Sequence, residues 1–133
     1  MTSQGKAKIL LVEDHEETAR VLARLLDLSG YAVSTAGTCA GAIELCERER
    51  FDLLISDVGL PDGSGYELMR TIAARRDPPK AIAVSGYGEE HDVAESRSAG
   101  FAEHIVKPVV FDALRDAIGR IMATTVRVQS SPE

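Results

Sequence analysis

The segment FDLLISDVGLPDGSG, residues 51–65, decides how the rest of the chain is interpreted. Residues 52–56 centre on large aliphatic side chains, which is typical of a strand buried in a parallel sheet. Residues 58–65 are rich in glycine and also contain Pro61 and Asp62, which favours a turn-forming loop. Asp57 therefore stands where a buried strand ends and a loop begins. On its own, such a carboxylate is equally well explained as an ordinary strand end.

Four more segments show strand patterns, and helical patterns separate them along the chain. These segments are residues 7–12, 31–35, 81–84 and 102–106. Together with residues 52–56 they predict five strands that alternate with five helices. Such alternation indicates an α/β fold, a doubly wound five-stranded parallel sheet with helices on both faces.

The helical segments carry their own start and stop signals. Asp14 is predicted to be the N-cap of the first helix and Gly30 its C′ residue, and Thr38 and Ser64 are predicted to cap the next two helices. The fourth helical segment has only Val93 as a large aliphatic residue and is expected to be weakly held. The residues expected to face the core are Val21, Leu22, Leu25, Leu26 and Leu28, then Cys39, Ala42, Ile43 and Cys46, then Leu68, Met69 and Ile72, and finally Leu114, Ala117, Ile118 and Ile121.

Charge and composition disfavour several classes of protein. The chain has 133 residues, 44% of them hydrophobic, and a formal net charge of −6. This length suits a single domain. The negative charge opposes direct binding to nucleic acid or to an anionic membrane surface. No segment has the length and apolarity needed to span a bilayer, so no membrane insertion is expected.

The two cysteines also bear on location. Cys39 and Cys46 are predicted to lie on one helix, where their spacing corresponds to about 10 Å. That distance is too long for a disulfide. Unpaired thiols, together with the absence of a secretory leader at the start of the sequence, indicate a reducing, cytoplasmic compartment. Both thiols are expected to be packing residues rather than redox groups.

Polar residues follow four of the predicted strands. Glu13 and Asp14 come after the first strand, Asp57 after the third, Ser85 after the fourth and Lys107 after the fifth. Each has an ordinary alternative explanation, such as a helix start, a turn or a loop hydroxyl. In a doubly wound sheet, however, ligands bind beyond the carboxyl ends of the strands. Their joint placement therefore predicts one site.

These residue types are suited to phosphoryl transfer. Clustered carboxylates repel one another unless a cation neutralises them, and oxygen ligands without His or Cys favour Mg²⁺, Mn²⁺ or Ca²⁺ over zinc. An aspartate such as Asp57 can attack phosphorus and form an acyl phosphate. The Lys107 ammonium and the Ser85 hydroxyl would then stabilise the phosphoryl oxygens.

With these motifs the chain resembles the receiver domain of two-component response regulators. The resemblance covers about residues 7–123 and leaves residues 1–6 and 124–133 as flexible ends. It implies a flavodoxin-like sheet with strand order 2-1-3-4-5. The motifs that carry it are Glu13-Asp14, Asp57 with the loop VGLPDG, Ser85-Gly86 and Lys107-Pro108.

The resemblance also implies a role for each site residue. Asp57 would accept a phosphoryl group from a histidine kinase or a histidine phosphotransfer protein. Asp14, Asp57 and the backbone carbonyl of Gly59 would bind Mg²⁺, with Mn²⁺ as an alternative, and Glu13 would act through a metal-bound water. Lys107 and Ser85 would contact the phosphoryl oxygens.

Three further residues bear on regulation. His104 occupies the position near the end of the fifth strand where the family usually has an aromatic residue. Because an imidazole titrates near neutral pH, it is either a switch coupled to pH or an ordinary strand histidine. Tyr87 is expected to lie over the site and to control access of water, and His15 is expected to point into solvent.

The leading interpretation is a phosphorylation-controlled binding module rather than a turnover enzyme. Phosphorylation would change the affinity of the fourth helix, fifth strand and last helix for an unknown downstream protein. A magnesium-dependent phosphohydrolase is disfavoured, because Gly59 cannot serve as a general acid and the chain has no room for a cap domain. A receiver-like module that works without phosphorylation is the third alternative. The chain is expected to be a monomer or a weak homodimer, either a stand-alone regulator or part of a larger protein.

Overall fold

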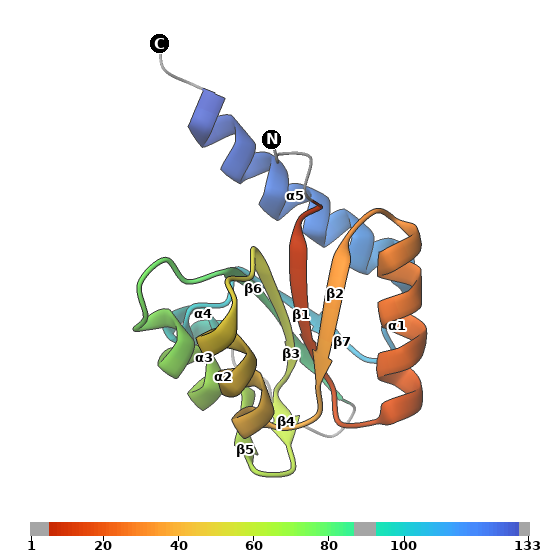
Figure 1. Cartoon of the computed structure of the whole chain (residues 1–133), viewed down its shortest axis with the longest axis vertical. Coiled ribbons are helices and arrows are strands. Elements are labelled where there is room, and N and C mark those ends of the chain that lie inside the picture. The colour runs from red at the N-terminus through yellow and green to blue at the C-terminus, as the bar shows by residue number, and fades with distance from the viewer. Residues whose placement is uncertain (1–5, 87–92, 131–133) are drawn as a thin grey trace.

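The computed structural model describes residues 6–86 and 93–130. Five parallel strands form one sheet in the order β2-β1-β3-β6-β7 (Figure 1). In chain order this is the predicted arrangement 2-1-3-4-5, so the fold prediction is confirmed. The strands are β1 (Lys8–Val12), β2 (Ala32–Ala36), β3 (Leu53–Asp57), β6 (Lys80–Ser85) and β7 (Glu103–Val106).

Helices cover both faces of the sheet, with α1 and α5 on one side and α2, α3 and α4 on the other (Figure 1). Alternate strand residues supply the two cores. Ile9 and Leu11 of β1 pack with α1 and α5, whereas Leu10 and Val12 pack on the opposite face. This two-sided burial explains why the strand segments read as continuous apolar runs. The helices are α1 (Glu16–Leu28), α2 (Cys39–Arg48), α3 (Gly65–Ala73), α4 (Val93–Ala99) and α5 (Phe111–Ser130).

Three of the four residues predicted to mark helix ends have the predicted role in the structure. The Thr38 hydroxyl accepts a hydrogen bond from the Gly41 amide, and the Ser64 hydroxyl accepts one from the Tyr66 amide. Gly30 has a φ of 104°, which suits a glycine at the C′ position, after the C-cap residue Ser29 of α1. The prediction for Asp14 is wrong, because α1 begins one residue later with His15 as its N-cap.

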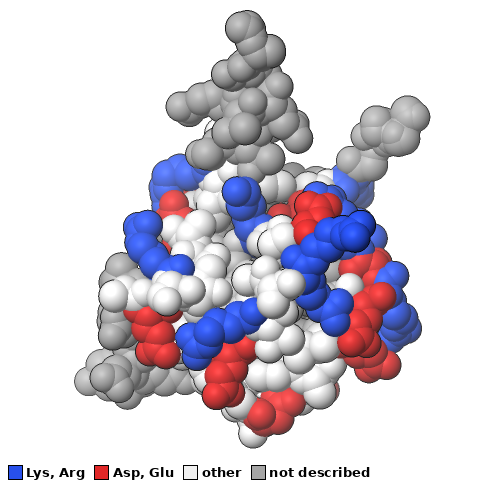
Figure 2. Space-filling view, turned by 90° about the vertical axis from the view of Figure 1, so that its left-hand side faces the viewer, with Lys and Arg blue, Asp and Glu red and all other residues white. Residues whose placement is uncertain are grey.

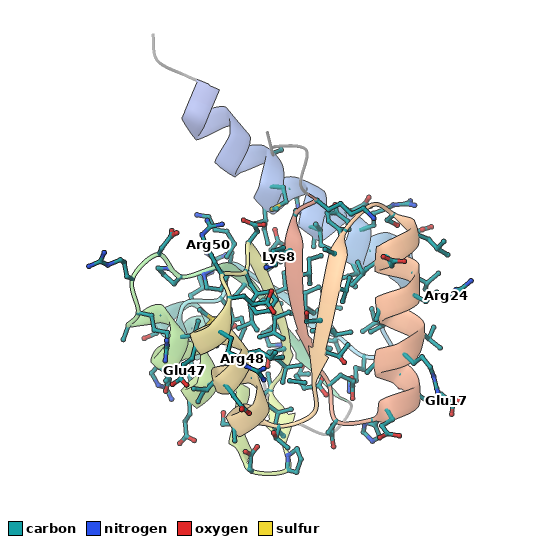
Figure 3. All side chains as sticks on the ribbon, viewed as in Figure 1. Lys8, Glu17, Arg24, Glu47, Arg48 and Arg50 are labelled. Carbon is teal, nitrogen blue, oxygen red and sulfur yellow. The ribbon has the colours of Figure 1, made fainter. Side chains whose placement is uncertain are left out.

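Fewer residues of α1 face the core than the sequence predicted. Leu22 and Leu26 are buried against the sheet, but Val21 is 53% exposed and Leu28 is 70% exposed. Helical periodicity gives the spacing of apolar residues, whereas the rotation of the helix about its axis depends on how it packs on the sheet. On the side of α1 away from the sheet, Glu17 and Arg24 project outward (Figure 3). The core residues predicted for α3 and α5 are all buried.

Other differences concern loops and ends. The loop after β3 contains a small antiparallel hairpin of β4 (Gly59–Leu60) and β5 (Gly63–Ser64), where only turns were expected. Helix α5 continues to Ser130, beyond residue 123 where the domain was expected to end. Flexibility at the two ends stays a prediction. Both cysteines are free, and none of the described helices is long and apolar enough to cross a membrane.

Candidate functional site

Side chains from three separate strands meet at the carboxyl edge of the sheet. Asp57 is the last residue of β3, Glu13 follows β1, and Lys107 follows β7. The Lys107 ammonium donates to Oδ2 of Asp57 at 3.2 Å and lies 3.0 Å from Oε1 of Glu13. The predicted convergence of these segments is therefore present in the structure.

Backbone hydrogen bonds between neighbouring segments hold these residues in place. The Glu13 amide donates to the Ala36 carbonyl, which extends the pairing of β1 and β2 by one residue. The Val58 amide donates to Val84, and the Lys107 amide donates to Ser85. Each loop thus leaves the sheet at a fixed point. The peptide bond between Lys107 and Pro108 is cis. The site is part of the sheet rather than a set of mobile loops.

Burial and mutual repulsion control the charges of the two acids. Glu13 is 4% exposed and Asp57 is 5% exposed. Burial raises the pKa of Asp57 to about 7, and the neighbouring Glu13 carboxylate adds to this effect while Lys107 opposes it. Burial also acts to raise the pKa of Glu13, but hydrogen bonds from His15 and Lys107 outweigh it and lower that pKa. The site therefore favours an added positive charge next to Asp57.

The residues that could hold a cation include His15, which was expected from the sequence to point into solvent. Glu13, Asp14 and His15 place ligand atoms within 4.8 Å of one another, and among the described residues Asp57 does not join this group. Asp57 is paired with Lys107 instead. The His15 ring is largely exposed as expected, yet its Nδ1 lies 2.9 Å from Oε2 of Glu13. Its position directly after two acids was the signal for this contact.

The hairpin that follows Asp57 is held at both ends. At its tip, the Asp62 carboxylate accepts hydrogen bonds from the Cys39 amide at 2.8 Å and the Ala40 amide at 3.0 Å, and these bonds lower its pKa. At its base, the Gly65 amide donates to the Val58 carbonyl at 2.7 Å. Sequence reasoning treated Asp62 only as a turn residue, because its partners lie on a helix far away in the sequence. Gly59 thereby has a defined position in β4, two residues beyond Asp57.

Known proteins share both this strand order and this sequence pattern. The profile of the response regulator receiver domain matches residues 9–119. The chain belongs to the receiver domain family. In general, receiver domains bind Mg²⁺ at an acidic pocket and interact with histidine kinases or phosphotransfer proteins.

Individual relatives support this membership. The receiver is 32% identical over 114 residues to the response regulator protein FleR of Pseudomonas aeruginosa, covering 86% of this chain and 24% of that protein. It is 28% identical to sporulation initiation phosphotransferase F of Bacillus subtilis, covering 86% and 93%. A CheY-like receiver domain from Methanospirillum hungatei superposes with a TM-score of 0.86 at 29% identity, covering 92% and 98%. The chain thus spans about a quarter of FleR but most of the smaller receivers.

Ser85 and His104 of this receiver are directly linked across the sheet. Ser85 is fully buried at the end of β6, and its Oγ lies 3.0 Å from Nε2 of His104 on β7. His104, which occupies the position where the family usually has an aromatic residue, therefore contacts Ser85, the hydroxyl expected to bind the phosphoryl group. A switching role for this pair stays a prediction. Tyr87, the other expected regulatory residue, lies outside the described residues.

An apolar pocket opens beside Lys107 and was not foreseen from the sequence. It has a volume of about 620 Å³ and lies between α1 and the segment after β7. Its lining includes Val21 and Leu22 from α1 and Pro108 and Val109 from the other side. Val21 was expected in the core, so its exposure here connects an apolar surface to the edge of the candidate site.

Proposed function

We propose that this receiver is a phosphorylation-controlled switch in which Asp57 accepts a phosphoryl group from a phosphohistidine donor in the presence of Mg²⁺. The observation that carries the proposal is the contact of the Lys107 ammonium with both Asp57 and Glu13. A carboxylate nucleophile, a second acid and a fixed counter-charge are the parts that phosphoryl transfer to aspartate requires.

The proposed step forms one bond and breaks one. A carboxylate oxygen of Asp57 attacks phosphorus, the bond between phosphorus and the donor's imidazole nitrogen breaks, and the imidazole leaves with the bonding electrons. The Lys107 ammonium, now 3.2 Å from Oδ2 of Asp57, would contact the transferred oxygens. The Ser85 hydroxyl would bind another of these oxygens. No proton has to be removed from Asp57 when it is ionised.

The metal site is proposed to consist of Asp14, Asp57 and the Gly59 carbonyl, with Glu13 acting through a water. Burial, and after it the neighbouring Glu13 carboxylate, raises the pKa of Asp57. A divalent cation fits such a site because it favours the charged form of the carboxyl group. Mg²⁺, or Mn²⁺ in its place, would supply charge neutralisation for the phosphoryl group. The chain's part is to keep these oxygens at the edge of the sheet.

The output surface is proposed to be formed by α4, β7 and α5. Movement of the Ser85 hydroxyl toward a phosphoryl oxygen would break its contact with Nε2 of His104. Val106 on the edge strand β7 is 49% exposed, so an apolar side chain is already available there to a downstream protein. This receiver would act as a signalling module in the cytoplasm, as a monomer or a weak homodimer.

Direct binding to nucleic acid is not part of the proposal. Basic and acidic side chains are interspersed on the face formed by α2, α3 and α4 (Figure 2). Ion pairs on this face join Arg75 to Glu47 and Arg48 to Glu44. Together with the net charge of −6, this pattern supports protein partners rather than phosphate backbones.

Incubation with Mg²⁺ and acetyl phosphate tests the proposal. We expect one phosphoryl group per chain, stable in acid and labile in base, and no labelling of Asp57→Asn. Asp112→Asn, which removes a carboxylate whose side chain is 78% exposed on α5, is the matched control and should label normally. The ¹⁵N resonances of the His104 ring should shift on phosphorylation in the wild type only. Continuous phosphate release would favour a hydrolase, and absence of labelling would favour a phosphorylation-independent module.

The pocket beside Lys107 is proposed to receive the protein that carries the phosphohistidine. It adjoins the ammonium that contacts Asp57, and its apolar lining offers area for a partner's side chains. Glu17 and His15 at its edge add polar contacts. A donor seated there would bring its imidazole to the edge of the sheet.

Val21→Glu should therefore slow phosphotransfer from a phosphorylated histidine phosphotransfer protein. We expect a decrease of at least about tenfold, because the substitution removes one apolar contact with the donor protein. Phosphorylation by acetyl phosphate should keep its wild-type rate, because the chemical groups are untouched. Leu28→Glu is the control, since Leu28 is also exposed on α1 but lies outside the pocket. Equal rates for the two variants with the protein donor would refute the assignment of this pocket.

A further inference from the structure

Asp62 is exposed at the tip of a hairpin, yet both of its carboxylate oxygens bind another element. It is one of the two residues that connect β4 to β5, and it lies three residues after Gly59. Its Oδ1 accepts a hydrogen bond from the Cys39 amide at 2.8 Å, and its Oδ2 accepts one from the Ala40 amide at 3.0 Å. The tip of the hairpin is therefore joined to the start of α2.

These two bonds complete the N-terminus of α2. The first amides of a helix have no carbonyl partners within that helix. The Thr38 hydroxyl serves only the third of them, because it accepts from the Gly41 amide at 2.9 Å. Asp62 serves the first two, and its bonds to them lower its pKa. The hairpin after Asp57 thus supplies a capping residue to a helix from an earlier part of the chain.

The hairpin depends on such an anchor because it is very short. Each strand has two residues, and Gly59 pairs with Ser64. An isolated two-stranded hairpin is marginally stable at best. The hydrogen bond of the Gly65 amide fixes its base, and Leu60 is partly buried against the core. The contacts of Asp62 fix its tip, so their loss would leave Gly59 less firmly placed.

We propose that Asp62 is a positioning residue for the divalent cation: by joining the hairpin to α2, it keeps Gly59 where its carbonyl can bind the ion. The inference rests on the cation site of the proposed function. The carboxylate of Asp62 is occupied by amides of α2, so it acts through the backbone of the hairpin rather than as a ligand. A hairpin without this anchor would have to be ordered when the cation binds, and that cost would weaken binding.

Calorimetric titration with Mg²⁺ tests the inference. Asp62→Ala should weaken Mg²⁺ binding by at least about fivefold. Thr38→Ala is the matched control and should bind Mg²⁺ like the wild type, because it removes a cap from the same end of α2 but leaves the hairpin anchored. Glu67→Gln removes another exposed acid close to Gly63 and should change the affinity by less than about twofold. Unchanged binding in Asp62→Ala, or an equal loss in Glu67→Gln, would overturn the inference.

Amide hydrogen exchange measured by NMR gives a readout that a cap of α2 alone would not change. Because the coupling between two sites is reciprocal, Mg²⁺ should slow the exchange of the Cys39 and Ala40 amides by a factor similar to the loss of affinity in Asp62→Ala. The Gly41 amide, which binds Thr38, should not respond. Mg²⁺ binding without slower exchange at Cys39 and Ala40 would overturn the role of Asp62 and leave the proposed function intact. If the wild type does not bind Mg²⁺, the cation site of the proposed function fails, and this inference fails with it.

Discussion

Replacing Asp57 by Asn is expected to stabilise the cation-free protein at pH 8 by a few kcal/mol, with about 4 kcal/mol as the upper bound. The reason is that Asp57 is buried beside Glu13 and has a pKa of about 7 instead of 3.8. Ionisation of the Asp57 carboxyl group is therefore less favourable in the folded protein than in the unfolded chain, and the difference lowers the free energy of unfolding. The amide of Asn has a similar shape but no charge.

The pH dependence follows from the sign of this shift. Because the folded pKa of Asp57 lies above the unfolded value, the folded state binds more protons between pH 3.8 and about 7. The contribution of Asp57 to stability is complete below that window and is lost as the pH rises through it. The advantage of Asp57→Asn should accordingly be small near pH 4 and largest above pH 7.

Urea unfolding in EDTA at several pH values measures this difference. Asp112→Asn should show no such trend, because its carboxylate is largely exposed on α5. Saturating Mg²⁺ should stabilise the wild type more than Asp57→Asn, which would reduce the difference between their free energies of unfolding. A wild type that is as stable as Asp57→Asn at pH 8 without a cation would contradict the expected cost of this buried charge.

Gly65→Ala is expected to destabilise the protein by at least about 3 kcal/mol, which corresponds to a Tm roughly 10 °C lower. A methyl group at Gly65 would overlap the carbonyl oxygen of Asp57 and lie 3.0 Å from the Asp57 carbonyl carbon and from Cα of Val58. These neighbours are backbone atoms and cannot rotate away as a side chain can. The loop that carries Asp57 out of the sheet would have to move.

Gly119→Ala is the matched control for this change. Gly119 lies on the exposed face of α5, and an added methyl group meets no atom within 4 Å. Because alanine favours a helix over glycine, this variant should be more stable by about 0.5 to 1 kcal/mol. Thermal unfolding of both variants compares the two positions. A Gly65→Ala protein that melts within about 2 °C of the wild type would refute the steric argument.

Much of the candidate site was predictable because chemistry and topology coincide in the sequence. A polar residue after each apolar run, in a chain that alternates strands and helices, must lie at the same sheet edge. Asp57, Glu13 and Lys107 were found in this way, and the structure brings them into contact.

The remaining features depend on contacts between residues far apart in the sequence. Asp62 looked like a turn residue, yet its carboxylate binds the first amides of α2. Val21 looked like a core residue, yet the rotation of α1 places it beside the pocket next to Lys107. Neither orientation follows from local pattern, because both are set by packing against another element.

The sequence by itself determined the fold class and the residues that meet at the carboxyl edge, because apolar periodicity and strand alternation leave few alternatives. The strand order was implied by the resemblance to receiver domains. Only the tertiary structure decided the charges and partners of those residues. The pKa of Asp57 is raised because the fold buries this carboxyl group beside Glu13, and the largely exposed ring of His15 contacts Glu13. Both outcomes depend on distances of a few ångströms between segments that only the folded sheet sets.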